Sequence, residues 1–457
     1  MLTTWKMVGV GGLCLLVLSK PVSSKVRDPG PRSGASAGGP IPGLTPDQLN
    51  LFNEGARRFA EIDSVADGLG PRMNLNSCSG CHAFPAIGGS SPKVNQQYQF
   101  ATGPNHGNNG VPPFMTASGP TREVRFKKTD KGAPDGGVHD IFTIAGMNGV
   151  PSSCKITQPD FSDKKNIIFR IPTPVFGGGL VEQIRDSDIL ANLQRQNPAK
   201  NQMQIKGKPN VVLSGNTRTE QKKVLGDTNN NGNDGTIARF GWKAQNKSLL
   251  IFAGEAYNVE MGISNELFET EREESCILAT PVVTPNDGTN RPDASKPLAI
   301  LSDIEVFSAF MRFLAPPEAS ATEPGGGPSI NKGRALFSQV GCNLCHTPSL
   351  TTDPHSRIAA LAGKPVNLFS DLAIHRMGDN LEDGISQGQA EGDEFRTAPL
   401  WGLGQRLFFL HDGRTTDLAE AIKEHKGSKS EANDVIRQYE HLRDEDKQHL
   451  LNFLRSL

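Results

Sequence analysis

The sequence predicts a mainly α-helical protein of two domains, the first of which carries a long irregular insertion with some short strands. The first observation is a repeated layout. Apolar residues at helical spacing lead into a Cys-x-x-Cys-His run at 78–82, and the same layout recurs at 342–346. The second observation is composition. Gly and Pro supply 49 and 32 of the 457 residues, which indicates many turns and loops between the two runs.

The N-terminal region is expected to precede the folded part of the chain. Residues 1–24 look like an export signal, because the apolar stretch after Lys6 is too short to span a bilayer and small residues follow it. Residues 25–43 are rich in Ser, Pro and Gly and are expected to form a disordered linker. These features predict a periplasmic or otherwise exported protein. An uncleaved signal would tether it to the membrane.

Two domains are expected to follow, at 44–320 and 321–457. Thr45 is expected to begin the first helix, since a proline and the glutamine of a capping box come directly after it. Ser329 is expected to begin the matching helix of the second domain, after a Pro- and Gly-rich stretch that marks the boundary. A closing helix is expected from Asp444 to the end of the chain.

The two Cys-x-x-Cys-His runs predict two covalently bound haem c groups. In such a run two thiols add to the vinyl groups of one haem, and the adjacent histidine becomes the proximal iron ligand. A zinc site would need a second ligand pair close by. A helix that leads into such a run opens a cytochrome c-like domain, so both domains are expected to have that fold. The residues expected to hold haem are Cys78, Cys81 and His82 in the first run and Cys342, Cys345 and His346 in the second.

The remaining cysteines and the net charge restrict the other properties. Of seven cysteines, Cys14 would leave with the signal, and Cys154 and Cys276 remain once haem is bound. In an oxidising compartment this pair is expected to form a disulfide, and two buried free thiols are the alternative. The net charge of −1 gives no reason to expect nucleic acid as a partner.

Three motifs near the C-terminus resemble the second haem domain of bacterial di-haem cytochrome c peroxidases. They are the run 395–401, the His-Asp-Gly run at 411–413, and the helical run 418–425. The chain is most similar to the di-haem oxidoreductase branch known as peroxidases or "thiol oxidoreductases". That branch carries the runs found here at 241–244, 394–402 and 411–414. The resemblance covers the chain from Thr45 to its end.

The resemblance implies an oxidoreductase that reduces hydrogen peroxide at the first haem. Electrons would arrive through the second haem from a small donor such as a cytochrome or a cupredoxin. Two other functions stay open. One is a non-catalytic electron-transfer cytochrome in which both irons are permanently six-coordinate. The other is an oxidase of an organic or protein substrate that works through both haems.

For the sixth ligand of the second haem, the resemblance implies the position of His425, where the peroxidases have methionine. His425 falls on the apolar face of its predicted helix, which suits a ligand. A core histidine bonded to a carbonyl is the alternative, and Met377 is a rival ligand. Ligation by two histidines would lower the haem potential relative to His–Met ligation.

For the first haem, the resemblance implies a displaceable histidine and an acid–base group beside the iron. His139 and His106 are the candidates for the first role, and His139 is preferred. Glu182 is the candidate acid–base group, because it follows glycines that allow close approach to a flat cofactor. Surface or core histidines, and an ion-paired glutamate, are the alternatives.

The resemblance also implies an aromatic bridge between the haems, for which Trp242 and Trp401 are candidates. Arg396 and Arg414 are candidates for pairing with haem propionates, because guanidinium binds carboxylates in a fork. Residues 227–235 alternate oxygen-bearing side chains as in a calcium loop, and related peroxidases hold calcium. The twelfth position of that loop is alanine instead of glutamate, so a polar turn is the alternative.

Overall fold

The computed structural model describes residues 26–33, 37–129, 131–132, 138–139, 141–195, 197–211, 237–269, 276 and 301–457. The predicted signal peptide and the predicted calcium loop lie outside these residues. Of the helices that the described residues form, none has both the length and the apolar character needed to cross a membrane.

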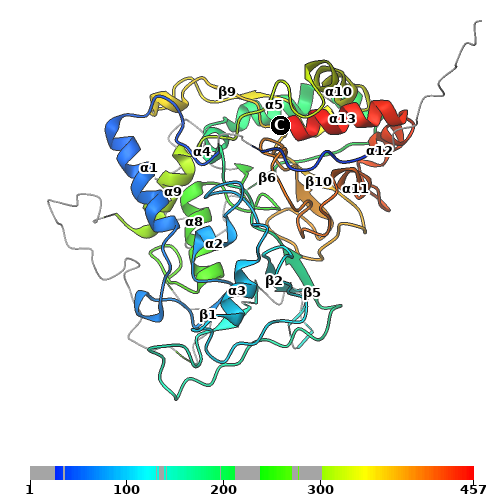
Figure 1. The fold of residues 1–457 in the computed structure, drawn as a ribbon. Coiled ribbons are helices and arrows are strands. Elements are labelled where there is room, and N and C mark those ends of the chain that lie inside the picture. The colour runs from blue at the N-terminus through cyan, green and yellow to red at the C-terminus, as the bar shows by residue number, and fades with distance from the viewer. Residues whose placement is uncertain are drawn as a thin grey trace, which may run out of the picture.

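The fold is a mixture of helices and small antiparallel sheets, so the prediction of a mainly α-helical chain is only partly correct (Figure 1). The helices are α1 Pro46–Phe59, α2 Cys78–Cys81, α3 Gln96–Thr102, α4 Gly178–Glu182, α5 Asp186–Arg195, α6 Asn197–Gln202, α8 Leu249–Met261, α9 Asp303–Phe313, α10 Gly327–Gln339, α11 Leu418–Lys423, α12 Asn433–Glu440 and α13 Asp444–Ser456. Short 3-10 helices are η1 Val65–Asp67, η4 Cys342–Leu344 and η5 Ala359–Leu361.

The strands are short, and the pairs that the described strands form are antiparallel. They are β1 Arg72–Met73, β2 Glu123–Phe126, β3 Val138–His139, β4 Phe142–Thr143, β5 Ile167–Arg170, β6 Asn210–Val211, β7 Ile237–Ala238, β8 Leu350–Thr351, β9 Pro365–Val366, β10 Ile374–Arg376 and β11 Glu394–Arg396. Among the described residues the largest sheet has three strands in the order β3-β2-β5, and the others are two-stranded. Strands this short carry little alternation in sequence, which is why the sequence predicts short strands only in general terms.

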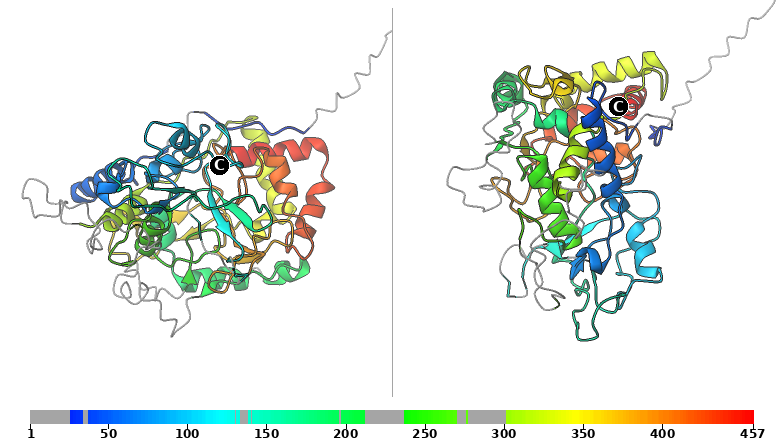
Figure 2. Two further views of the ribbon diagram at one scale, coloured as in Figure 1. Left: turned by 90° about the horizontal axis from the view of Figure 1, so that it is seen from below. Right: turned by 90° about the vertical axis from the view of Figure 1, so that its left-hand side faces the viewer.

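A pair of helix crossings organises the molecule, one for each Cys-x-x-Cys-His run. Helix α1 packs across α9, with α8 beside it, and α10 packs across α13 (Figures 1 and 2). At each crossing a glycine lets the two backbones touch. A Cβ atom on Gly55 would lie 2.4 Å from the carbonyl oxygen of Val306, and one on Gly333 would lie 2.0 Å from that of His449. The predicted helix before each run is therefore confirmed.

The two crossings also share their aromatic packing. Four residues after each glycine comes a phenylalanine, Phe59 in α1 and Phe337 in α10. The ring of Phe59 lies 5.1 Å from that of Phe310, and the ring of Phe337 lies 5.5 Å from that of Phe453. Apolar burial at equivalent points thus holds each helix in the same relation to the run that follows it.

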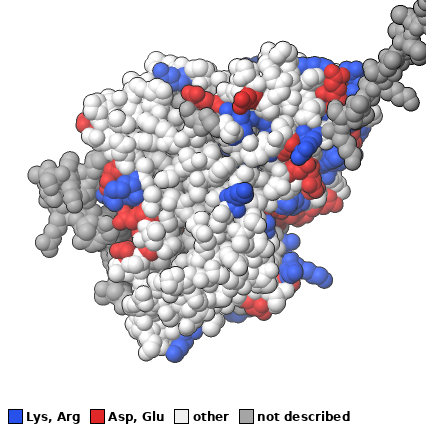
Figure 3. Space-filling model, viewed as in Figure 1, with Lys and Arg blue, Asp and Glu red and all other residues white. Residues whose placement is uncertain are grey.

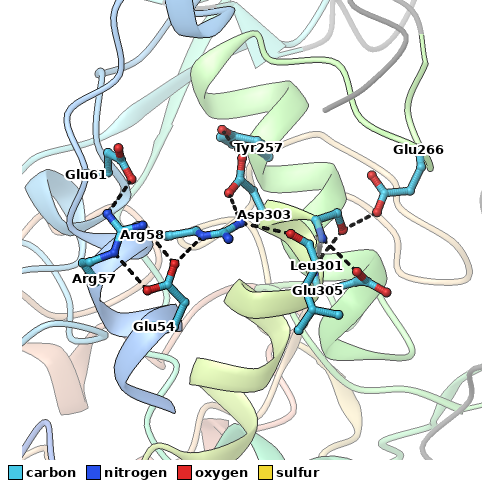
Figure 4. Close-up of polar contacts among 10 residues, drawn as sticks. Glu54, Arg57, Arg58, Glu61, Tyr257, Glu266, Leu301, Asp303 and Glu305 are labelled. Carbon is cyan, nitrogen blue, oxygen red and sulfur yellow. Dashed lines mark hydrogen bonds and ion pairs between the residues drawn. The ribbon is translucent and has the colours of Figure 1, made fainter. Parts of the chain in front are cut away.

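Buried charge adds to the first crossing (Figure 4). Arg58 is 7% exposed; its Nη1 donates to Asp303 Oδ1 at 2.9 Å and its Nε to Glu54 Oε1 at 2.8 Å. The hydroxyl of Tyr257 donates to the other oxygen of Asp303 at 3.2 Å. Since a buried charge is tolerated when it is paired and hydrogen-bonded, these contacts fix α1, α8 and α9 together.

The structure corrects the prediction of a disordered linker at 25–43. Its described part lies along the protein surface, where the backbone N–H of Ile41 donates to the carbonyl of Phe313 at 2.7 Å. Asp28 accepts from Nη2 of Arg455 at 2.6 Å, and Arg455 is only 1% exposed. A buried guanidinium requires a counter-ion, and the segment supplies it from more than 400 residues away. Composition alone does not reveal such a partner.

The structure bears on the predicted cysteine pairing and on the predicted start of the helix before the second run. The disulfide between Cys154 and Cys276 is confirmed. The expected start of α10 at Ser329 is wrong, because the helix begins at Gly327 and the Ser329 hydroxyl pairs with Nδ1 of His449 at 2.7 Å. The glycine-rich turn already permits the helix to start there, so no side-chain cap is required.

The domain boundary near residue 320 stays a prediction. Buried ion pairs join the segments on its two sides. Arg170 pairs with Asp383 and Lys200 pairs with Asp371, in both cases with almost fully buried side chains. The two halves therefore share polar core as well as surface. On the face seen in Figure 3, basic and acidic side chains are interspersed, which agrees with the net charge of −1.

We expect Gly333→Ala to destabilise the protein by about 1–3 kcal/mol, the usual cost of overpacking a core, because the added methyl group collides with the backbone of α13. The measurement is the denaturant midpoint of the holoprotein. Gly39→Ala is the control, since a Cβ there meets nothing within 4 Å. Equal midpoints for both variants would contradict the close crossing.

Candidate haem sites

The first Cys-x-x-Cys-His run forms α2 and presents one nitrogen of its histidine. His82 Nδ1 lies 3.0 Å from the carbonyl oxygen of Gly89, which can only accept a hydrogen bond. Nδ1 therefore carries the proton and Nε2 is left as a potential iron ligand. Burial lowers the pKa of His82 to about 4, so the imidazole is neutral. The ring of Phe59 packs edge-on against it, with centroids 5.9 Å apart.

The second run has the same arrangement. His346 Nδ1 lies 3.0 Å from the carbonyl oxygen of Phe369, and the ring of Phe337 lies 6.3 Å from the imidazole. Burial, and then the charge of His425, lower the pKa of His346 to about 4. Both histidines thus meet the requirement for a proximal ligand whose orientation is set by the backbone.

A cavity of about 610 Å³ adjoins the first run and fits a haem. Its walls come from α8, from β2 and β5, and from the loop at 241–245. Three buried polar atoms on the wall find no hydrogen-bond partner among the described residues: Arg122 Nε, Thr121 Oγ1 and Gln245 Oε1. Such atoms are costly unless a ligand satisfies them. A haem, which is a flat apolar group with two propionates, suits a mostly apolar cavity in which Nε of Arg122 lacks a hydrogen-bond partner among the described residues.

One buried guanidinium and one half-buried guanidinium lie on the wall of a second, narrow cavity. Arg396 and Arg406 line a narrow cavity of about 40 Å³, which shares Trp242 with the first cavity. Burial and then the neighbouring Arg406 charge lower the pKa of Arg396 to about 10, and burial lowers that of Arg406 to about 10. Within the described part of the chain no carboxylate forms an ion pair with either. Two guanidiniums that have no carboxylate partner among the described residues suit the two propionates of one haem.

The structure therefore corrects one of the two predicted propionate partners. Arg414 is at the surface, where Nε pairs with Asp412 at 2.8 Å and Nη1 with Glu424 at 3.1 Å. Its charge is already compensated, so Arg406 is the better candidate beside Arg396. The sequence signal for Arg406 was weak, because a single arginine in a loop is more often exposed.

The two candidate tryptophans take different positions. Trp242 lies on the wall of both cavities and donates Nε1–H to the carbonyl of Ile171 at 2.9 Å. Trp401 lines only the narrow cavity and packs on Gly177, whose φ of 68° and lack of Cβ permit that contact. The glycines before Glu182 thus approach an aromatic side chain. Trp242 is the better placed of the two for an electron bridge.

His425 lies close enough to His346 to affect the pKa of that imidazole. Its Nδ1 lies 2.8 Å from the carbonyl oxygen of Ala421, which leaves Nε2 free, and its charge acts on His346. Met377 instead packs in an apolar cluster with Trp242 and Phe395. The geometry favours His425, and the ligand itself stays a prediction.

The acid–base role predicted for Glu182 stays a prediction, and the contacts of this side chain do not favour it. Glu182 is fully buried, is absent from the cavity wall, and accepts from Nε of Arg312 at 2.7 Å and from the backbone N–H of Leu249 at 2.9 Å. The carboxylate joins α4 to α8 and α9. It is held by a guanidinium and a backbone donor, so it cannot reach a ligand in the cavity.

The carboxylates that do line the first cavity were missed. They are Glu123 in β2, and Glu255 and Glu260 in α8. Glu260 Oε2 accepts from Nδ2 of Asn74 at 2.7 Å. Burial and then the charge of Glu260 raise the pKa of the Cys81 thiol, which places this carboxylate near the first run. Acidic residues within an otherwise apolar helix were the available signal.

The two histidines proposed as displaceable ligands are not both at the cavity. His106 Nδ1 lies 2.7 Å from the carbonyl oxygen of Asn109 within its own loop, and His106 is absent from the cavity wall. His139 lies in β3, where its backbone pairs with Val124 of β2. The ligand role of His139 stays a prediction.

The sequence profile of the family described as "Di-haem oxidoreductase, putative peroxidase" matches residues 124–457. The chain belongs to this family, and the predicted resemblance is confirmed. The family implies two haem groups. The match contains the second Cys-x-x-Cys-His run and starts after the first, so the first site depends on its own motif and geometry. No curated protein matches the chain.

Three solved structures are similar to parts of the chain. A MauG-like protein associated with microbial copper homeostasis is 19% identical, with a TM-score of 0.32, over 48% of this chain and 71% of its own. The di-haem peroxidase BthA from Burkholderia thailandensis is 16% identical, with a TM-score of 0.27, over 48% and 65%. Hydrazine synthase from Kuenenia stuttgartiensis is 19% identical, with a TM-score of 0.23, over 34% of this chain and 55% of its own.

We expect Arg406→Met to lower the midpoint potential of the second haem by about 60 mV or more, a tenfold change for a one-electron couple. A nearby cation disfavours the more positive ferric state, so its removal favours that state. Spectroelectrochemical titration of the holoprotein measures the shift. Arg414→Met, at the solvated ion pair, is the matched control. A change of the midpoint potential in Arg414→Met alone would make Arg414, and not Arg406, the propionate partner.

Proposed function

We propose that this chain is an exported di-haem c-type oxidoreductase that reduces hydrogen peroxide at the first haem with electrons delivered through the second. The observation that carries the proposal is an asymmetry between two otherwise equivalent sites. Both histidines have Nδ1 bonded to a carbonyl. The first site adds a cavity of about 610 Å³ with carboxylates on its wall, and the second has His425 near His346.

Covalent attachment follows from the chemistry of the runs. The thiols of Cys78 and Cys81, and those of Cys342 and Cys345, add across haem vinyl groups, with the sulfur and hydrogen ending on the two vinyl carbons. All four thiols are free in the described chain. The remaining pair, Cys154 and Cys276, forms a disulfide, which supports an oxidising, extracytoplasmic location.

At the first site the chain must move protons. Reduction of one peroxide to two waters consumes two electrons and two protons, and one proton has to pass from the inner to the outer oxygen. A bound haem would supply the iron at which this occurs. Glu260 is the proposed proton-transfer group, because it lies on the cavity wall and Asn74 Nδ2 orients its carboxylate. Arg122 and Thr121 would hold the propionates.

At the second site the chain sets the potential. His425 would complete the coordination with a second imidazole, which lowers the potential relative to a thioether ligand, whereas Arg396 and Arg406 raise it. Trp242, on the wall of both the large and the narrow cavity, is the proposed bridge for electrons.

A non-catalytic electron-transfer cytochrome is the second candidate, and His425 is the observation that favours it, because two histidine ligands are usual in such carriers. EPR spectra of the oxidised and half-reduced holoprotein with hydrogen peroxide separate the two. A high-spin haem that reacts with peroxide supports the oxidoreductase. Two low-spin haems inert in every state support the carrier.

We expect Glu260→Gln to slow the reaction of the half-reduced protein with peroxide by about 100-fold or more, the usual contribution of a positioned acid–base group. Stopped-flow absorbance measures the rate. Glu255→Gln, on the same helix and the same cavity wall, is the control and should lose much less. The reverse order would move the role to Glu255.

We expect His425→Met to raise the potential of the second haem by more than about 100 mV, since axial ligands shift haem potentials over about 0.8 V. The expected spectroscopic sign is a methionine-to-iron charge-transfer band near the red end of the spectrum. Met377→Leu is the control. If that variant alone changes the ligand spectrum, Met377 is the sixth ligand.

A further inference from the structure

We propose that a basic basin beside the second Cys-x-x-Cys-His run is the docking surface for an acidic electron-transfer protein. The inference rests on the proposed function, in which electrons arrive through the second haem. It goes further by naming the surface and the charge of the partner. The basin is a depression of about 710 Å³ formed by residues 203–208, by β10, and by the turn that leads into α12.

The basin reaches the second run through one layer of side chains. Met203 lies on its wall and also packs in the small apolar cluster that contains Cys342 and Cys345. Gly207 lies against the imidazole of His375, because a Cβ there would be 2.0 Å from Cε1. His375 Nδ1 in turn lies 3.7 Å from Sγ of Cys345.

This proximity matters because electron tunnelling slows steeply with distance. The thioether side of a haem attached at Cys342 and Cys345 would lie just beneath the floor of the basin. Of the cavities described above, the first belongs to the other run and the narrow one is internal. A donor protein in the basin would therefore place its redox centre near the second haem.

The rim of the basin is basic. Five basic side chains line it against three acidic ones. Each of the acidic ones already has a cationic partner: Glu394 pairs with Lys208 at 3.0 Å, Asp434 with Arg437 at 2.9 Å, and Glu431 with the buried His375 at 2.9 Å.

Two exposed ammonium groups are left over. Lys206 and Lys429 both line the basin and have no ion pair with any carboxylate of the described residues. Uncompensated charges of one sign around a depression steer a partner of the opposite sign and raise its association rate. A small redox protein whose active edge is ringed with carboxylates fits this surface.

The test uses the holoprotein and its charge-reversed variant K206E/K429E. The protein is reduced, desalted and mixed in a stopped-flow instrument with oxidised plant plastocyanin, an acidic blue-copper protein. Each encounter moves one electron from haem to copper. Because the same surface serves both directions of transfer, this probe reports on docking even though it accepts electrons. K164E/K165E, at two exposed lysines in the turn before β5, makes the same charge change elsewhere.

We expect the rate with the wild-type protein to fall as salt is added and the K206E/K429E variant to react about tenfold more slowly at low salt. The control variant should keep the wild-type rate. With horse cytochrome c, a basic protein, K206E/K429E should react faster than wild type. Absorption spectra of the haems confirm that each variant is folded.

A rate that does not depend on salt, or an equal loss in both variants, would overturn the docking surface. The peroxide reaction of each pre-reduced variant is measured separately and should be unchanged. If no variant reacts with peroxide while the plastocyanin rates behave as expected, the proposed function fails and the docking surface stands.

Discussion

The close crossing of two helices at a glycine is the constraint on which both candidate haem sites depend. Gly55 and Gly333 let α1 and α10 contact the backbones of α9 and α13, and this places Phe59 and Phe337 against the two imidazoles. The imidazoles are then fixed by hydrogen bonds to carbonyls from segments outside the crossings. Each proximal ligand is thus oriented by backbone geometry before any iron is present.

Equivalent constraints at the two sites leave the remaining residues free to differ. At the first site, α8 carries acidic side chains to the wall of a large cavity. At the second site, His425 follows α11 and lies near His346. The differences in proposed chemistry therefore arise from residues far from the motifs. The two Cys-x-x-Cys-His runs by themselves indicate only that the chain binds haem.

Buried charge fixes the region between the sites. Lys243 is fully buried, pairs with Asp383 at 3.1 Å, and lies 4.0 Å above the ring of Phe395. Arg170 reaches the same Asp383 from β5. Since breaking a buried pair strands a charge, these contacts hold the wall beside Trp242 rigidly and prevent the two halves of the chain from separating freely. The proposed electron path from the basic basin to the first cavity crosses this wall.

The sequence by itself determined the features that are local. The two Cys-x-x-Cys-His runs, the helix before each, the capping box at Thr45 and the leftover cysteine pair all depend on residues close together or on simple counting. The family followed from the runs at 241–244, 394–402, 411–414 and 418–425. Tertiary structure decided every role that depends on a distant partner. Glu182 is part of a buried ion pair because Arg312 reaches it, and Asp28 is held by Arg455. Spacing in the sequence contains no information on such pairs, because the contacts join segments tens to hundreds of residues apart.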